Sequence, residues 1–312
     1  MNKILITGGN GFLGSNVVRL FVNMGYEVMV LSKKSDKISD ILHNIELIEC
    51  GDDYNIHKDR IIKFSPNCVL DFAWVGGNNH KHTNSIDQYK NNIPRSIELL
   101  SIISELHNCK FIGVGSFSEY GVINKPATED DSDNPISYYG LSKSIVKNIS
   151  KLFCKHNKIR WAWIRPCYVY GPGDVPTRLI PSVISKLIIG DSVMLGSCNT
   201  TIDYLYIDDF CSGVLSIVKE EIDGVVNICS DNQYYLVDII NHIQKLTLNN
   251  NVQFCPDKDN QFSSSYVCGS NLKLRSNSKW TPCVDIVTGL IKTIEFNNKK
   301  NIITVTKSER RL

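Results

Sequence analysis

The feature that most constrains the fold is a glycine-rich turn directly after the first apolar run of the chain. The run covers Lys3–Thr7, and the turn continues from it as Thr7-Gly8-Gly9-Asn10-Gly11-Phe12-Leu13-Gly14. Glycines spaced by three let the backbone leave a strand sharply and approach a pyrophosphate, whose charge then faces the N-terminus of the next helix. Such a turn also occurs as an ordinary strand–helix connection, but its place between an apolar run and an amphipathic stretch favours a dinucleotide site. The residues expected at the cofactor are Gly8, Gly11, Phe12, Leu13 and Gly14.

Short apolar runs alternate with longer amphipathic stretches throughout the N-terminal half. The apolar runs are Lys3–Thr7, Glu27–Leu31, Glu46–Cys50, Cys68–Trp74, Lys110–Gly115 and Arg160–Arg165. The amphipathic stretches, with apolar residues three and four apart, include Phe12–Met24, Gln88–Leu106 and Tyr139–His156. This alternation predicts an α/β fold, a Rossmann-type doubly wound parallel sheet with helices on both faces.

After Pro166 the pattern changes, because loops lengthen and strands no longer alternate cleanly with helices. We expect a dinucleotide-binding Rossmann domain at residues 1–166 and a mainly substrate-binding region at 167–296, some of whose elements return to the sheet. This smaller region should pack against the carboxyl edge of the sheet and form one wall of a cleft. The polar residues 297–312 should form a frayed tail.

Composition narrows the class of protein. With 34 basic and 32 acidic residues and a net charge of +2, a general nucleic-acid binder is not expected. The eleven cysteines are scattered without a C-x-x-C pair, which favours reduced thiols in a cytoplasmic protein and offers no zinc site. No secretory leader is evident and no apolar run approaches the roughly 20 residues that span a bilayer, so no membrane partner is expected.

The end of the second apolar run indicates which dinucleotide binds. NAD-binding folds usually place a carboxylate there to hold the ribose hydroxyls, whereas this chain has Ser32, Lys33 and Lys34. A hydroxyl and two ammonium groups suit the extra phosphate of NADP(H), which a carboxylate would repel. The alternative is that the lysines are solvated and Asp36 reaches back to the ribose, which would leave NAD(H) possible.

Three polar residues suggest acid–base chemistry. Tyr139 and Lys143 are four apart at the start of an amphipathic stretch, so both can reach one pocket. An ammonium beside a phenol lowers the pKa of the phenol and makes it a usable proton donor or acceptor. Such a pair is common by chance. A catalytic role for it is supported by Ser116, which follows the fifth apolar run and should lie at the carboxyl edge of the sheet.

With these motifs in this order, the chain resembles the extended short-chain dehydrogenase/reductase family, in its nucleotide-sugar epimerase, dehydratase and reductase group. The resemblance runs from Lys3 to about Glu295 and implies a catalytic triad of Ser116, Tyr139 and Lys143. Tyr139 would exchange a proton with a sugar oxygen, Ser116 would hydrogen-bond that oxygen, and Lys143 would hold the nicotinamide ribose. The resemblance also implies a nucleotide-sugar substrate and a homodimer.

The same resemblance extends the cofactor site. One residue should approach the adenine, two should line the dinucleotide after the fourth apolar run, and the segment from Arg165 should support the carboxamide of the nicotinamide. The additional residues implied are Asp52, Phe72, Ala73, Asn92, Pro166 and Cys167.

The chain departs from the family pattern at several positions. Dehydratases of the family carry an Asp-Glu pair where this chain has Phe117-Ser118, so dehydration is not expected. Glu119 is one position too far along, and its plainer interpretation is a solvated loop carboxylate.

Members that bind UDP-sugars often carry an arginine where this chain has Ile202 and an asparagine at Tyr168. Arg178 is the candidate replacement for the diphosphate contact, although a surface arginine is the alternative. Trp74 could stack on the sugar or be a buried wall. The residues expected on the substrate side are Trp74, Ser116, Ser118, Tyr168 and Arg178.

These features favour an NADP(H)-dependent reductase of a 4-keto-6-deoxy nucleotide sugar. The segment 115–121 resembles the motif of deoxysugar-forming members. One alternative is an NAD-dependent nucleotide-sugar 4-epimerase, since the same triad serves both reactions. An alternative of another class is a non-catalytic dinucleotide sensor, although such a protein could dispense with Tyr139 and Lys143.

Overall fold

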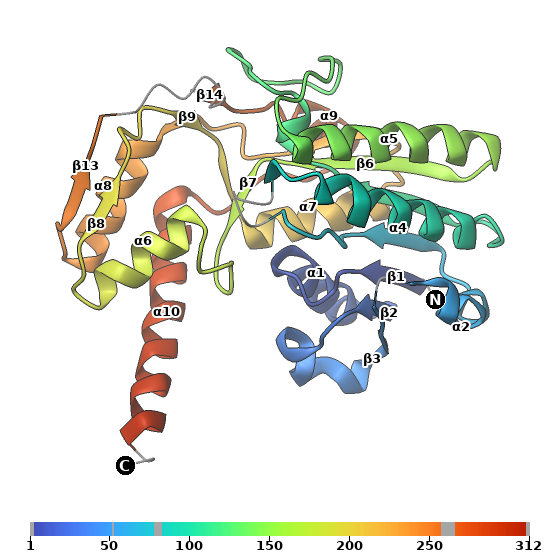
Figure 1. The fold of residues 1–312 in the computed structure, drawn as a ribbon, viewed down its shortest axis with the longest axis horizontal. Helices are drawn as coiled ribbons and strands as arrows, with labels where there is room; N and C mark the ends of the chain where they lie inside the picture. Colours follow the sequence, from blue (N-terminus) through green and yellow to red (C-terminus); the bar gives the residue numbers. More distant parts are fainter. Residues whose placement is uncertain (1–2, 52, 78–82, 257–265, 310–312) are drawn as a thin grey trace.

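The computed structural model describes residues 3–51, 53–77, 83–256 and 266–309. Its centre is a seven-stranded parallel sheet in the order β11-β6-β5-β4-β1-β2-β3 (Figure 1). The strands are β1 (Lys3–Thr7), β2 (Glu27–Ser32), β3 (Ile45–Glu49), β4 (Cys68–Asp71), β5 (Lys110–Val114), β6 (Arg160–Pro166) and β11 (Gly224–Ile228). The predicted α/β, Rossmann-type fold is therefore confirmed.

Successive side chains of each strand point to opposite faces of the sheet, and helices pack against both faces. In β1, Ile4 and Ile6 are fully buried in one apolar cluster and Leu5 is fully buried in another. The first cluster lies under α1 (Phe12–Asn23) and α7 (Ile207–Lys219), which pack against each other. The second lies under three helices that contact one another in sequence order, namely α2 (Lys58–Phe64), α4 (Asp87–Ile103) and α5 (Tyr138–His156).

The remaining elements form a smaller lobe beside the sheet and several short connections. Figure 1 shows α6, α8, β8 and β13 together in this lobe. The short helix α9 (Leu272–Asn277) packs against β11 of the main sheet, and the helices of the lobe are α6 (Leu179–Ile188), α8 (Leu236–Thr247) and α10 (Ile286–Glu309). Its small sheets join β7 (Tyr168–Tyr170) to β10 (Tyr204–Tyr206), β8 (Val193–Leu195) to β13 (Val252–Phe254), and β9 (Thr201–Ile202) to both β12 (Tyr234–Tyr235) and β14 (Tyr266–Val267). Three 3₁₀ helices are η1 (Asp36–Asn44), η2 (Asn55–His57) and η3 (Phe117–Glu119).

The end of the chain differs from the expectation of a frayed tail, because α10 continues to Glu309. The helix begins at a clear N-terminal cap, in which the Asp285 carboxylate accepts hydrogen bonds from the backbone N–H groups of Val287 and Thr288, both at 3.0 Å. Its first turns are anchored by buried Leu290 and Ile294. Anchoring by tertiary packing therefore carries the helix into the polar segment.

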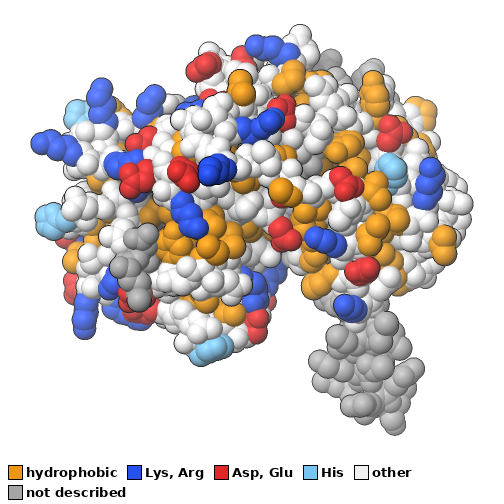
Figure 2. Space-filling model, turned by 180° about the vertical axis from the view of Figure 1, so that it is seen from behind, with side chains coloured by type: hydrophobic (Ala, Val, Ile, Leu, Met, Phe, Trp, Pro, Cys, Tyr) orange, Lys and Arg blue, Asp and Glu red, His pale blue; other side chains and the backbone are white. Residues whose placement is uncertain are grey.

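The surface and the cysteines add three observations. Figure 2 shows Lys, Arg, Asp and Glu side chains mixed over one face of the molecule. All eleven cysteines are free thiols, and among the described residues no group of three or more His, Cys, Asp or Glu side chains could hold a metal ion. Within the described ranges, none of the helices has the length and apolar character that crossing a bilayer requires.

The buried face of β1 gives a stability prediction. Leu5→Ala should lower the free energy of unfolding by about 2–5 kcal/mol, because it leaves a cavity between the sheet and α4. Leu272→Ala is the matched control, since Leu272 is 66% exposed and its truncation should change stability by no more than about 0.5 kcal/mol. Urea unfolding of both variants measures the difference, and equal losses would contradict the assigned core.

Candidate active site

The glycine-rich turn packs its backbone against the loop that follows β4. Gly8 has a φ of +65°, and a Cβ there would lie 2.7 Å from the backbone nitrogen of Ala73. A Cβ at Gly14 would lie 2.4 Å from the carbonyl oxygen of Gly8. Gly11 is the N-cap of α1 and supplies no side-chain cap, so the first N–H groups of this helix are left for a ligand or water. The turn is therefore built as an anion cradle.

A cleft of about 260 Å³ opens beside this turn. It is lined by residues from the ends of β1, β2, β3 and β4 and from α4: Gly8, Asn10, Gly11, Leu31, Ser32, Lys33, Lys34, Cys50, Gly51, Tyr54, Phe72, Ala73, Trp74, Val75 and Arg95. The structure thus brings together seven of the residues expected at the cofactor, including both lysines, whereas Gly14, Tyr139 and Lys143 do not line this cleft. Asp52, expected near the adenine, lies outside the described residues.

Five other residues expected at the cofactor do not line this cleft. Phe12 and Leu13 pack into the core between α1 and the sheet. Asn92 is fully buried and holds the loop after β4, since its Oδ1 accepts from the backbone N–H of Val75 at 2.8 Å. Pro166 is the buried end of β6, and Cys167 lies in a small apolar cluster with Phe117, Tyr120, Ala127 and Cys229.

Arg95 and Tyr54 line the cleft but were missed at the sequence level. Arg95 is 5% exposed and donates to the carbonyl oxygen of Ala73 at 2.6 Å. A stripe of polar residues in the sequence could have indicated Arg95, because Gln88, Asn92 and Arg95 are spaced by four and three residues and share one helix face. All three are buried, so this face of α4 holds the loop after β4.

The three expected catalytic residues meet at the carboxyl end of β5. Ser116 follows this strand as the N-cap of η3, and its side chain acts on the Tyr139 phenol, whose pKa it lowers. Tyr139 and Lys143 lie in the first turns of α5, which Ser137 caps by accepting from the backbone N–H of Gly140 at 3.0 Å. Lys143 Nζ donates to the carbonyl oxygen of Val114 at 2.6 Å.

The electrostatics of this group differ from the sequence-based expectation. Burial raises the pKa of Tyr139, against the opposing effects of the Ser116 side chain and the charge of Arg178. The net shift is therefore opposite to the expected lowering by Lys143, because burial outweighs the neighbouring groups. The Lys143 ammonium lies 5.8 Å from the centre of the Tyr139 ring and 3.5 Å from that of Trp74. Burial lowers the pKa of Lys143 itself to about 7.

Trp74 borders the catalytic pair directly. Its ring meets that of Tyr139 edge-on, with 6.1 Å between the ring centres, and its indole N–H donates to Gln88 Oε1 at 2.8 Å. The indole is therefore fixed against Tyr139 and Lys143 and also lines the dinucleotide cleft. Stacking on a sugar stays a prediction.

The other residues expected on the substrate side lie around the same group. Ser118 is exposed and its hydroxyl lies 3.2 Å from that of Ser116. Tyr168 is 48% exposed. Arg178, the N-cap residue of α6, forms an ion pair with Asp174 at 3.4 Å, and its charge acts on the phenols of both Tyr139 and Tyr168. The positive charge of Arg178 therefore lowers the pKa values of both phenols.

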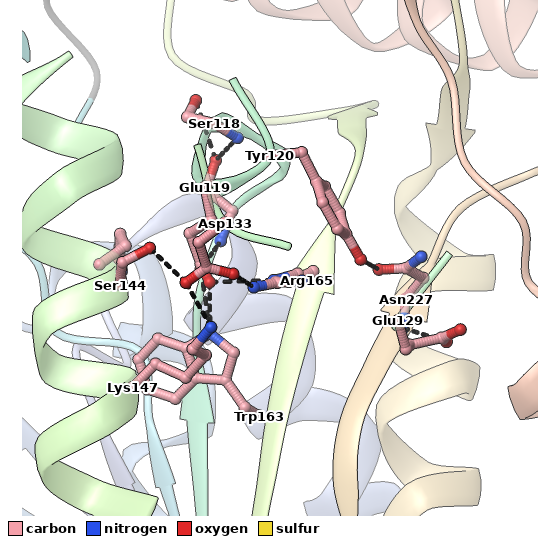
Figure 3. A network of polar contacts seen from close by, with 12 residues as sticks. Ser118, Glu119, Tyr120, Glu129, Asp133, Ser144, Lys147, Trp163, Arg165 and Asn227 are labelled. Atoms are coloured by element: carbon pink, nitrogen blue, oxygen red, sulfur yellow. Dashed lines mark hydrogen bonds and ion pairs between the residues drawn. The ribbon is translucent and has the colours of Figure 1, made fainter. Parts of the chain in front are cut away.

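One sequence-based interpretation is wrong. Glu119 is fully buried, not solvated, and its carboxylate accepts from the backbone N–H of Ser116 at 2.8 Å. Arg165, which begins the segment expected near the nicotinamide carboxamide, has a side chain that is 1% exposed and pairs with Glu119 and Asp133 (Figure 3). Burial raises the pKa of the Glu119 carboxyl, against the opposing charge of Arg165.

A Rossmann sheet with a glycine cradle and a Ser–Tyr–Lys group at its carboxyl edge defines an NAD(P)-dependent enzyme of the oxidoreductase type. The family model described as "NAD dependent epimerase/dehydratase family" matches residues 4–229. The chain belongs to this family, as the resemblance predicted.

Relatives and solved structures agree with this membership. The chain is 24% identical over 236 residues to a dTDP-6-deoxy-L-talose 4-dehydrogenase (NAD(+)) of Aggregatibacter actinomycetemcomitans, covering 73% of this chain and 84% of the relative. It is 27% identical over 231 residues to a CDP-abequose synthase of Salmonella muenchen, covering 70% of each. The structure of a UDP-glucose 4-epimerase with UDP-glucose from Thermotoga maritima shares the fold, with a TM-score of 0.88, 24% identity, and coverage of 96% of this chain and 99% of that one.

The buried lysine predicts a pH-dependent stability. The pKa of Lys143 is about 7 in the folded protein and about 10.4 in an unfolded chain, so the charged lysine costs stability most below pH 7 and progressively less as the pH rises toward 10.4. Lys143→Met should raise the free energy of unfolding at pH 6, and this gain should shrink by roughly 1–3 kcal/mol by pH 9.

Urea unfolding of the variant and the wild type at pH 6 and pH 9 measures this change. Lys151→Met, at an exposed lysine of the same helix, is the matched control for losing a surface charge. An equal gain at both pH values for Lys143→Met would contradict the lowered pKa.

Proposed function

We propose that this protein is an NADP(H)-dependent reductase of a 4-keto-6-deoxy nucleotide sugar. The observation that carries the proposal is the grouping of Ser116, Tyr139 and Lys143 at the carboxyl end of β5, where Lys143 donates to the carbonyl oxygen of Val114. Two relatives carry names of enzymes of nucleotide-linked sugars, one of them a 4-dehydrogenase of a 6-deoxy sugar, and they support both the substrate class and the position of the reaction.

The dinucleotide cofactor fits the cleft on structural grounds. A Cβ at Gly8 or Gly14 would collide with neighbouring backbone, so only glycine allows this tight turn, and the N-terminus of α1, which has no side-chain cap, suits a pyrophosphate. Ser32, Lys33 and Lys34 line the same cleft and suit the additional phosphate of NADP(H). Asp36 is occupied by Asn10, whose amide donates to its carboxylate at 3.0 Å, which counts against a carboxylate reaching back to the ribose.

Reduction of a ketone needs a hydride and a proton. When bound, the cofactor supplies the hydride for the carbonyl carbon. The carbonyl oxygen then needs a proton, and we assign this role to Tyr139, because its raised pKa keeps the phenol protonated at neutral pH. Ser116 would hydrogen-bond the same oxygen and orient it toward Tyr139. Arg178, whose charge lowers the pKa of Tyr139, would contact the diphosphate of the substrate.

The side chains of η3 count against dehydration. Phe117 is buried in an apolar cluster, Ser118 is a hydroxyl, and Glu119 points inward and is neutralised by Arg165. The 3₁₀ helix therefore offers the sugar no acid–base pair, and the proposal stays with hydride and proton transfer.

The phenol gives the first functional prediction. Addition of a 4-keto-6-deoxy nucleotide sugar should make the wild type consume NADPH, and Tyr139→Phe should lower kcat by about 10²–10⁴-fold while leaving NADPH binding intact. Tyr138→Phe is the matched control, because Tyr138 is the preceding residue of the same helix and 45% exposed.

Other outcomes separate the alternatives. Interconversion of two nucleotide sugars without net NADPH consumption would replace the reductase with a 4-epimerase. Tight cofactor binding without turnover of any keto or hydroxy nucleotide sugar would favour a dinucleotide sensor.

The two lysines give a prediction on cofactor choice. Lys33→Ala combined with Lys34→Ala should weaken NADPH binding by about 10- to 100-fold, since a hydrogen bond to a charged group contributes about 1.5–3 kcal/mol. Binding of NADH should change by less than about threefold, because it lacks the phosphate that the lysines face. Isothermal titration measures both, with Lys151→Ala combined with Lys155→Ala on the exposed side of α5 as the control. Equal weakening of both cofactors would refute the NADP preference.

A further inference from the structure

The fully buried carboxylate of Glu119 is hydrogen-bonded to the backbone of Ser116. Glu119 is the last residue of η3, and Ser116 and Glu119 form a reciprocal capping box. The Ser116 hydroxyl accepts from the backbone N–H of Ser118 at 3.1 Å, and the Glu119 carboxylate accepts from the backbone N–H of Ser116 at 2.8 Å. A Cβ at Gly115 would lie 2.1 Å from Glu119 Oε1, so the carboxylate packs tightly under the strand end.

The carboxylate is held in turn by β6. Arg165 Nε donates to it at 2.9 Å and the indole N–H of Trp163 donates at 3.0 Å. The Arg165 guanidinium lies 4.2 Å from the ring centre of Tyr120, which leaves it little freedom to turn. A buried charge is tolerated only with a well-placed partner, so the position of Glu119 is set by Arg165.

The same arginine connects this pair to the catalytic helix. Arg165 Nη2 also donates to Asp133, which accepts from Ser144 Oγ at 2.6 Å and pairs with Lys147. Ser144 and Lys147 belong to α5, the helix that carries Tyr139 and Lys143 in its first turns. Figure 3 shows side chains of η3, β6 and α5 converging on these contacts.

We propose that the buried chain of contacts Glu119–Arg165–Asp133 positions Ser116 relative to Tyr139, so that Glu119 is a positioning residue for the proton transfer. The inference rests on the proposed function only in that both need the Ser116–Tyr139 pair to act on substrate. Close packing makes the geometry intolerant, since a Cβ at Gly140 of α5 would lie 2.3 Å from the carbonyl oxygen of Ser118. Misplacement by about 1 Å can cost roughly 100-fold in rate.

A second ion pair, between a buried lysine and a half-exposed aspartate, offers a comparison. Lys110 begins β5, at the strand end opposite Ser116, and pairs with Asp223 at 3.0 Å while donating to the carbonyl oxygen of Ile222 at 2.7 Å. Its side chain is 8% exposed. Lys110→Met therefore disrupts a buried charge of the same strand without touching the catalytic group.

The test compares kcat and KM for the keto sugar in Glu119→Gln, Asp133→Asn and Lys110→Met, alongside the wild type and Tyr139→Phe. Glu119→Gln should lower kcat by roughly 10- to 100-fold, with KM and the Kd for NADPH within about twofold of the wild type. Lys110→Met should keep kcat within about twofold of the wild type, even if its Tm falls as much as the Tm of Glu119→Gln.

A double-mutant cycle separates positioning from a general structural role. If Glu119 acts through Ser116, adding Glu119→Gln to Ser116→Ala should lower kcat by no more than about twofold further. Losses that multiply in the double variant, an unchanged kcat in Glu119→Gln, or an equal loss in Lys110→Met would each overturn the proposal.

Two further arms keep the test decisive. If Glu119→Gln fails to fold, Asp133→Asn carries the comparison, because it leaves the Glu119–Arg165 pair intact; it should lower kcat by roughly 3- to 10-fold, and an unchanged kcat overturns the proposal. If the wild type epimerises nucleotide sugars and does not reduce them, the reductase proposal fails, and the same kcat comparisons on epimerisation decide the role of Glu119 separately.

Discussion

The structure depends on one short hydrogen bond between neighbouring strand ends. Thr7 closes β1 and donates its hydroxyl to Asp71 of β4 at 2.6 Å, and the same oxygen accepts from the backbone N–H of Ala73 at 3.0 Å. This bond fixes the loop that carries Trp74 against the turn at Gly8, where a Cβ would have no room. Because the strands are parallel, the cofactor turn and the catalytic loop share one edge of the sheet.

Burial sets the protonation states at that edge. It raises the pKa of Tyr139 and lowers that of Lys143, so each favours its neutral form. A protonated phenol can donate the proton that the reduction of a ketone needs. The charged form of Lys143 costs stability, because it is buried. The cost of burying the Glu119 carboxylate is offset in another way, because Arg165 forms an ion pair with it inside the protein.

Much of the fold could be predicted, because its causes are local. The apolar run at Lys3–Thr7 and the glycine spacing after it gave the first strand, the turn and the start of α1. The parallel sheet with helices on both faces followed from the alternation of strands and helices along the chain. Tyr139 and Lys143 could be paired from their spacing alone, but the face that Arg95 presents to the cleft could not, because it depends on how α4 packs.

The sequence by itself determined the strand–turn–helix order and the dinucleotide cradle, since these need only neighbouring residues. The resemblance to the family singled out Ser116, Tyr139 and Lys143 as one group. Only the tertiary structure decided that Glu119 is a buried anchor and that Lys143 lies against Trp74. The partners of these side chains come from elements far apart in the chain, such as Arg165 at 46 residues from Glu119. Burial and pairing of a charge are properties of the packed interior, which no local pattern encodes.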